Sequence, residues 1–222
     1  GRLGVQRWKG SRIRGESGSR CEQFLTLPEL LNILRGVGRP IGLAIEFKHP
    51  SPYQLKLEDR VLGVLRGEGW DAGTSMVDNV RVTFMSFSPD SVKHLLRSVP
   101  AAFICQLVDD IDVDELRDDL SLGPLTGGAI ANLMKAAQLE GERILDDCEV
   151  GLAGPGIMYV REHARTVQRW LESGRRFRVW TVDSARDVAL CQGLGIHEIT
   201  TNKPASVLAQ LQPSGQQVQL PS

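Results

Sequence analysis

The sequence predicts an α/β fold, a (β/α)8 TIM barrel of which about six of the eight strand-helix units are visible. Segments with strand character alternate with helical segments along most of the 222 residues, and this order favours parallel strands joined by right-handed crossovers. A closed barrel needs eight strands, so two units are expected to be missing from the front of the chain. The expected strands begin near residues 41, 80, 101, 148, 177 and 196.

The composition indicates one globular domain and excludes several kinds of protein. With 41% hydrophobic and 24% charged residues, the chain can bury a substantial core. A formal net charge of -1 argues against a general nucleic-acid or membrane-surface binder, which would carry a basic excess. No apolar run is long enough for stable membrane insertion. The four cysteines lack zinc-ligand spacing, so no structural zinc site is expected. They are also too scattered for a dense disulfide framework, which predicts reduced thiols and a cytoplasmic protein; they are Cys21, Cys105, Cys148 and Cys191.

Three segments are expected along the chain. Residues 1–25 are rich in Gly, Ser and Arg without periodicity, which predicts an irregular lead-in. Residues 26–211 are predicted to form the barrel domain, and residues 212–222 a flexible polar tail. The domain is expected to start with a helix, because Thr26 and Glu29 have the types and spacing of a capping box. Gly36 is expected to end that helix.

The strand expected at 41–48 carries two opposite charges near its end. Side chains in a strand alternate between its two faces. One face is apolar and should pack under helices. The other face carries small residues followed by charged ones, as expected if the small residues point into a crowded barrel interior and the charged ones lie at a site at its C-terminal end. The apolar row is Ile41, Leu43, Ile45 and Phe47, and the other row is Gly42, Ala44, Glu46 and Lys48.

The remaining elements follow from hydrophobic periodicity and from Gly, Pro and Ser signals at their ends. Gly127 and Gly128 are expected to form a turn before a short helix. Further strands are expected at 80–87, 101–108, 148–153, 177–182 and 196–200. Helices are expected at 53–66, 88–98, 129–138, 159–172, 184–194 and 204–211.

Two apparent ligand motifs are not expected to bind ligands. The acidic run from Asp109 to Asp119 lacks the central glycine and the final glutamate of an EF-hand, so no metal role is expected there. The glycine-rich turn at 127–128 lacks a following Lys-Ser/Thr pair, so it is not a phosphate-binding P-loop.

Glu46 and Lys48 allow two interpretations from the residues alone. Their spacing places both side chains on one face of the strand, at its C-terminal end. They could form a partly buried ion pair without further function. Alternatively, Glu46 is an oxygen ligand for a hard divalent cation, and Lys48 contacts an anionic group beside it.

Several motifs resemble those of glycerophosphodiester phosphodiesterases, in the same order along the chain. The segment Glu46-Phe47-Lys48 is similar to the Glu-Ile-Lys signature of that family. Four further segments resemble a Thr-Leu-Glu-Glu helix start, a Ser-Phe strand end, a Trp-Thr-Val-Asn strand and a closing Thr-Asp-x-Pro turn. These segments are Thr26–Leu31, Ser86–Phe87, Val179–Asp183 and Gly195–Pro204, so the resemblance covers Thr26 to Leu211.

The resemblance implies a TIM barrel that hydrolyses glycerophosphodiesters to glycerol 3-phosphate and an alcohol with a divalent metal, Mg or Ca. It implies that Glu46 is a metal ligand and that Lys48 is a catalytic contact to the phosphate. Trp180 and Ser86 would line the substrate pocket, although a core tryptophan and a structural serine are the ordinary alternatives. A small-molecule substrate, no nucleic acid and a possible oligomer complete this expectation.

The chain departs from the family pattern in its acid-base groups. The family has a His-Arg-Gly motif, paired Glu and Asp ligands and a His-Asp motif ahead of the helix at Thr26, and none occurs in this sequence. None of the histidines follows the catalytic pattern, so each is expected to be structural or exposed; they are His49, His94, His163 and His197. The chain is therefore expected to be a C-terminal portion of an enzyme, and inactive alone.

Two alternatives remain open at this stage. The chain could be a non-catalytic barrel remnant that serves as a binding or interaction module. It could also belong to a related phospholipase that uses the same Glu46 and Lys48 on a larger lipid. The alcohol head group and the identity of the metal are not encoded in any recognisable motif.

Overall fold

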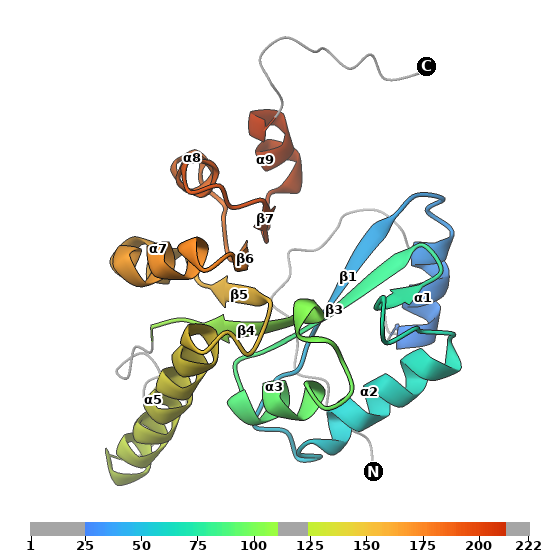
Figure 1. The fold of residues 1–222 in the computed structure, drawn as a ribbon, viewed down its shortest axis with the longest axis horizontal. Coiled ribbons are helices and arrows are strands. Elements are labelled where there is room, and N and C mark those ends of the chain that lie inside the picture. Colours follow the sequence, from blue (N-terminus) through green and yellow to red (C-terminus); the bar gives the residue numbers. More distant parts are fainter. Residues whose placement is uncertain (1–24, 111–123, 212–222) are drawn as a thin grey trace, which may run out of the picture.

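A curved parallel sheet with helices on its outer side forms the centre of the molecule (Figure 1). The computed structural model describes residues 25–110 and 124–211. The strand order is β1-β3-β4-β5-β6-β7, and every neighbouring pair in it is parallel. The bounds are β1 Ile41–Glu46, β3 Val80–Ser86, β4 Ile104–Val108, β5 Leu152–Pro155, β6 Arg176–Val179 and β7 Glu198–Ile199. The six predicted strands are thus confirmed, in sequence order.

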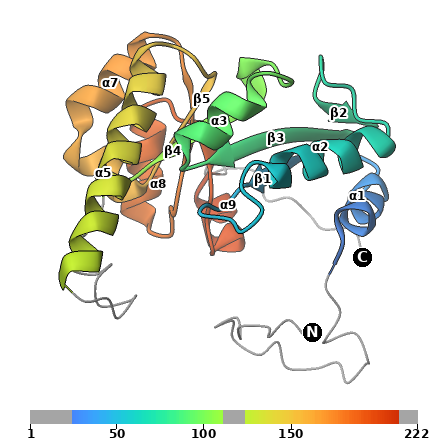
Figure 2. The same cartoon turned by 90° about the horizontal axis from the view of Figure 1, so that it is seen from below.

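Helices connect the successive parallel strands as crossovers, whereas α1 precedes β1 and α9 follows β7. Figure 2 shows α1, α2 and α3 beside β1 and β3. Among the described residues, no helix is both long and apolar enough to cross a membrane. The bounds are α1 Leu27–Arg35, α2 Lys56–Gly67, α3 Pro89–Leu95, α5 Pro124–Asp146, α6 Ile157–Glu162, α7 Ala164–Glu172, α8 Ala185–Gly193 and α9 Pro204–Leu211, with a 3-10 turn at Ala101–Phe103.

Side-chain caps start several helices at the predicted residues. In α1, the Thr26 hydroxyl accepts from the Glu29 backbone N–H, and the Glu29 carboxylate accepts from the Thr26 N–H at 2.8 Å. This reciprocal capping box satisfies backbone donors that a helix start leaves free. Ser88 and Ser184 cap α3 and α8 without the reciprocal contact, since each hydroxyl accepts from the backbone N–H three residues later. Local sequence thus fixes where these helices begin.

The alternation predicted for β1 is confirmed, but its inner face is open. Ile41, Leu43 and Ile45 pack against the core, whereas Gly42 and Ala44 are exposed. The crowded interior expected on the glycine side is not observed in the described part of the chain. The reason is topological, since β1 stands at one end of the strand order and, among the described strands, pairs with β3 alone.

Aromatic side chains fill the core between the sheet and the helices. Phe84 of β3 is fully buried, stacks against Phe47 with ring centroids 6.2 Å apart, and meets the edge of Trp70 at 5.7 Å. Tyr159 and Trp170 stack at 6.0 Å on the other half of the molecule. The first of these clusters includes the residue that directly follows the end of β1, because Phe47 comes after Glu46.

Several predicted boundaries were wrong. The turn at Gly127 and Gly128 and the short helix at 129–138 are parts of one longer helix, α5. The helix carries these glycines despite their low propensity, because its last turns pack on the core through the buried Ile144 and Leu145. The strand expected from Cys148 begins later, at Leu152.

Two further boundaries differ for local reasons, and one short strand was not predicted. The predicted helix at 159–172 is two helices, since His163 has non-helical dihedrals of φ −111° and ψ 40°. Residues 101–103 turn before β4, with Phe103 N–H donating to Pro100 O at 3.0 Å. The short antiparallel strand β2, Met76–Val77, was not predicted; its hairpin turn places Asp78 at φ 52°.

The buried Phe84 should be far more important for stability than Phe87, which is 44% exposed on the same strand end. We expect Phe84→Ala to lower the free energy of unfolding by about 3–5 kcal/mol, because it opens a cavity in the core. Phe87→Ala is the matched control and should cost about 1 kcal/mol or less. Urea denaturation followed by circular dichroism measures both, and equal losses would contradict this assignment of the core.

Candidate active site

The predicted site residues lie at the C-terminal ends of the parallel strands. Glu46 ends β1, Ser86 ends β3 and Trp180 follows β6. Parallel strands all end at the same edge of their sheet, and α/β proteins place their binding sites there. We call this edge, with the residues that directly follow the strands, the rim.

Glu46 and Lys48 contact each other on the rim. Lys48 Nζ donates to Glu46 Oε1 at 2.9 Å, and the two side chains are 82% and 26% exposed. An ion pair this exposed contributes about 0–1 kcal/mol to stability. Both charges therefore remain accessible to a ligand, and neither is required by the core. Their roles as metal ligand and phosphate contact stay predictions.

Ser86 is fully buried beneath the rim. Its hydroxyl donates to Phe47 O at 2.7 Å and accepts from Ser88 N–H at 3.1 Å. These contacts tie the residue between Glu46 and Lys48 to the end of β3, which is the structural role considered as the alternative. Direct contact of Ser86 with a substrate stays a prediction.

Trp180 forms an aromatic pair with Phe87 across the rim. Its indole N–H donates to Gly154 O at 2.9 Å, and the two rings meet edge to face with centroids 5.5 Å apart. Phe87 was not predicted as a site residue, although its position after Ser86 in the Ser-Phe motif could have indicated it. The pair offers an apolar surface on the same edge of the sheet as Glu46 and Lys48.

Asp109 adds a carboxyl group to the rim after β4. It lies so close to Gly156 that a side chain at that glycine would overlap the carboxyl group. Burial raises the pKa of Asp109, and the neighbouring Asp110 and Glu162 carboxyls act in the same direction. The glycine after β5 is therefore needed for Asp109 to lie here.

The described residues bring metal-ligating groups together at one place. Asp110, Glu162 and His163 have ligand atoms within 4.8 Å of one another. Asp110 belongs to the acidic run for which no metal role was expected, and the rest of that run from 111 onward lies outside the described residues.

Glu46 does not form a complete metal site with its described neighbours. Within residues 25–110 and 124–211, no cluster of three such ligands includes it. A hard divalent cation takes about six oxygen ligands. The single Glu46 carboxylate is therefore compatible with such a cation but cannot hold it alone.

Three of the four histidines contact carboxylates in the described structure. His49 Nε2 lies 2.7 Å from Glu58 Oε1, and His94 Nε2 lies 2.7 Å from Asp59 Oδ1. His163 lies 2.8 Å from Asp110, and His197 is exposed. None of them lies free at the rim beside Lys48 in the described structure.

Asp183 joins the ends of β6 and β7. Its carboxylate accepts from Asn202 N–H at 2.7 Å, from Asn202 Nδ2 at 3.0 Å and from Thr201 Oγ1 at 2.9 Å. The next residue, Ser184, caps helix α8. The segments similar to Trp-Thr-Val-Asn and Thr-Asp-x-Pro thus meet through these hydrogen bonds.

A sequence model of the glycerophosphoryl diester phosphodiesterase family matches residues 4–206. The chain belongs to this family. Two curated relatives, both named probable glycerophosphodiester phosphodiesterase 1, come from the CDC 1551 and H37Rv strains of Mycobacterium tuberculosis. Each is 26% identical over 190 residues, which are 85% of this chain and 59% of the relative. The chain thus spans about three fifths of the length of these relatives.

Solved structures of glycerophosphodiester phosphodiesterases share the fold. The crystal structure of a glycerophosphodiester phosphodiesterase from Parabacteroides distasonis has a TM-score of 0.50 and 16% sequence identity. The match covers 82% of this chain and 62% of the Parabacteroides chain. The crystal structure of a putative glycerophosphoryl diester phosphodiesterase from Silicibacter pomeroyi has a TM-score of 0.50 and 17% sequence identity, and the match covers 83% of this chain and 55% of that chain. At these identities the likeness supports the barrel fold alone.

Acid should weaken the junction that Asp183 makes in this phosphodiesterase-family chain. Hydrogen bonds from Asn202 and Thr201 lower the pKa of Asp183, so the folded state favours the ionised form. The resulting stability is fully present above the ordinary aspartate pKa of about 3.9, and is lost as the pH falls through the lower folded-state pKa. We expect Asp183→Asn to be less stable than the unmodified chain near pH 7, with a difference that shrinks as the pH falls below the ordinary aspartate pKa of about 3.9. Urea denaturation across this range checks the trend, and a difference independent of pH would contradict it.

Proposed function

We propose that this chain supplies the metal and phosphate side of an active site that hydrolyses glycerophosphodiesters to glycerol 3-phosphate and an alcohol. The observation that carries the proposal is the contact between Glu46 and Lys48, 2.9 Å apart and accessible at the rim. Membership of the phosphodiesterase family supports this substrate class.

Each rim residue has a role in this proposal. The exposed Lys48 ammonium reaches a phosphate oxygen and offsets negative charge that develops in the transition state. Glu46 accepts from that ammonium and thereby directs it along the rim. Trp180 and Phe87 form the apolar wall against which the rest of the substrate packs.

A divalent cation, Mg or Ca, is part of the proposal. When bound, it would polarise a phosphoryl oxygen of the substrate. Glu46 is the residue proposed to ligate it, and its carboxylate is 26% exposed at the rim. Because the described neighbours do not complete such a site, the further ligands are proposed to come from other residues of the whole enzyme.

The acid and the base are also proposed to lie elsewhere in the whole enzyme. His49, His94 and His163 each contact a carboxylate, and the sequence contains no His-Arg-Gly motif. We therefore propose that the chain is a C-terminal portion of the enzyme and has no turnover alone. The free thiols of Cys105, Cys148 and Cys191 support a cytoplasmic location, and an oligomer remains part of the proposal.

The test compares site variants in the full-length natural protein with glycerophosphocholine as substrate and Mg or Ca added. We expect Glu46→Gln and Lys48→Ala each to lower kcat by about 10²–10³-fold, because each removes a charge that acts on the transition state. Matched controls on outer helices are Glu172→Gln of α7 and Lys135→Ala of α5, both exposed. These should retain full activity.

Two outcomes would change this conclusion. Full activity of Glu46→Gln would show that the metal ligand is assigned to the wrong residue. Absence of turnover in the unmodified full-length protein with either metal would favour the alternative, a non-catalytic barrel that binds phosphodiesters or a partner.

A further inference from the structure

The backbone on the N-terminal side of Lys48 is anchored to β3. Phe47 N–H donates to Met85 O at 2.8 Å, and Ser86 Oγ donates to Phe47 O at 2.7 Å. The Phe47 ring is 2% exposed and stacks on Phe84. Both the main chain and the side chain of Phe47 are therefore fixed.

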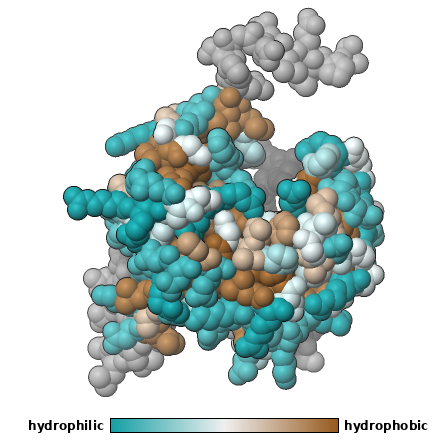
Figure 3. Space-filling view, in the orientation of Figure 1, coloured by the Kyte–Doolittle hydropathy of each residue, from teal (hydrophilic) through white to brown (hydrophobic). Residues whose placement is uncertain are grey.

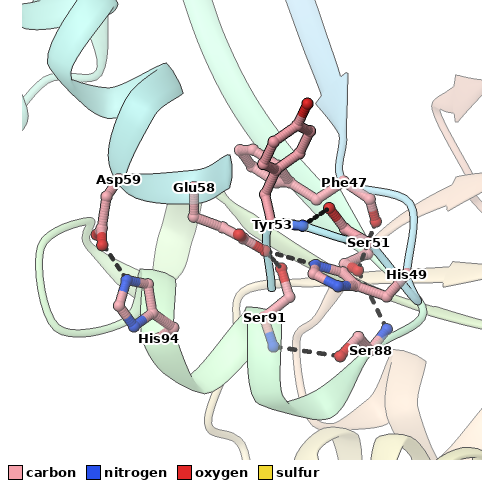
Figure 4. A network of polar contacts seen from close by, with 10 residues as sticks. Phe47, His49, Ser51, Tyr53, Glu58, Asp59, Ser88, Ser91 and His94 are labelled. Atoms are coloured by element: carbon pink, nitrogen blue, oxygen red, sulfur yellow. Dashed lines mark hydrogen bonds and ion pairs between the residues drawn. The ribbon is translucent and has the colours of Figure 1, made fainter. Parts of the chain in front are cut away.

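A separate polar network anchors the C-terminal side of Lys48 (Figure 4). His49 Nε2 lies 2.7 Å from Glu58 Oε1 of α2, and the same oxygen accepts from Ser91 Oγ of α3. Ser91 is held in turn, since its backbone N–H donates to Ser88 Oγ at 3.3 Å. One carboxylate oxygen thus joins the loop after β1 to two helices.

The network requires the burial of a polar carboxylate, which costs free energy that ordinary apolar helix packing does not. Glu58 and Ser91 are fully buried, and the His49 side chain is 15% exposed. The second oxygen, Glu58 Oε2, has no hydrogen-bond partner within the described structure. Burying an incompletely paired carboxylate is unfavourable, and an apolar residue would join α2 and α3 more cheaply. A directional contact to His49 is what the carboxylate adds.

Successive residues point in opposite directions as a result. Phe47 and His49 are turned towards the helices, whereas Lys48 between them is 82% exposed at the rim. Fixing both neighbours restricts the backbone of Lys48, and so restricts the directions in which its flexible side chain can extend.

We infer that His49 and Glu58 are positioning residues for Lys48: the buried Glu58 carboxylate, oriented by Ser91, holds His49 and thereby aims the lysine at the phosphate of the substrate. The consequence for catalysis rests on the proposed function, whereas the anchoring itself does not. Misplacing a catalytic group by about 1 Å can cost about 100-fold in rate.

The chain contains a matched control for this network. His94 of α3 lies 2.7 Å from Asp59 of α2, so it forms the same kind of histidine-carboxylate contact one residue further along α2. Within the described structure, neither His94 nor Asp59 forms a hydrogen bond or ion pair with the loop at 47–50, and Figure 4 shows them on the far side of Glu58 from His49. Loss of a helix-joining contact can therefore be separated from loss of the anchor.

The first experiment needs no enzymatic activity. Hydrogen-deuterium exchange of this chain, followed by mass spectrometry of peptides spanning residues 46–50, compares His49→Gln and Glu58→Gln with His94→Gln. We expect exchange in this segment to become about tenfold faster in the first two variants, as loss of one charge-assisted hydrogen bond allows. It should be unchanged in His94→Gln. Equal exchange in all three variants would overturn the inference.

The second experiment measures kcat and KM in the full-length protein with glycerophosphocholine. We expect His49→Gln to lower kcat about tenfold or more with KM changed less, since the lysine is aimed at the transition state. His94→Gln should keep its kcat. Unchanged kcat in His49→Gln, in a protein where Lys48→Ala is inactive, would overturn the positioning role. If Lys48→Ala is itself fully active, the proposed function fails, while the exchange experiment still decides the anchoring.

A variant that removes less of the network controls for the possibility that His49→Gln or Glu58→Gln fails to fold. Ser91→Ala removes one hydrogen bond to Glu58 and keeps the histidine contact. It should give a smaller increase in exchange at 46–50 and a smaller loss of kcat than His49→Gln. A change in global stability with neither local effect would also count against the inference.

Discussion

The parallel pairing of β1 with β3 is the constraint on which the site depends. Its register runs from Ile41 opposite Val80 to Glu46 opposite Met85. This register buries Val80, Val82 and Phe84 and leaves Glu46 at the strand end. A slip of one residue would exchange the two faces of the strand, placing a carboxylate in the core and isoleucine at the rim. The same strand register therefore determines both which side chains pack in the core and where the charged side chains lie.

Local patterns in the sequence were sufficient to predict the six parallel strands, the capped helix starts and the proximity of Glu46 to Lys48. Each depends on residues within a few positions of one another, and alternation alone puts two residues at i and i+2 on one face. Helix α5 was predicted too short because its glycines suggest a turn, whereas packing of its last turns determines the helix. The open inner face of β1 could not be predicted, since it depends on which strands lie beside it.

Contacts between segments that are far apart in the sequence could not be predicted from local patterns. Glu58 lies on a predicted helix and resembles an ordinary surface residue in the sequence, yet it is fully buried and accepts a hydrogen bond from Ser91, 33 positions later. Phe87 meets Trp180 only because β3 and β6 end at the same edge. The histidines were predicted to be structural or exposed because no catalytic motif contains them, and their carboxylate partners could not be predicted from the sequence. Membership of the phosphodiesterase family rests on the sequence model that matches residues 4–206, whereas the roles proposed for individual residues are argued from these contacts.

The setting of Trp180 also makes the molecule suitable for optical measurement. Trp70 and Trp170 are 6% and 1% exposed within the core, and Trp8 lies outside the described residues. Trp180 is partly exposed at the rim, with its indole N–H held by a carbonyl and its ring against Phe87. Its emission should respond to a molecule that enters beside Lys48, whereas the two core indoles provide a constant background. The intrinsic fluorescence of the chain therefore contains a reporter of ligand binding that requires no label.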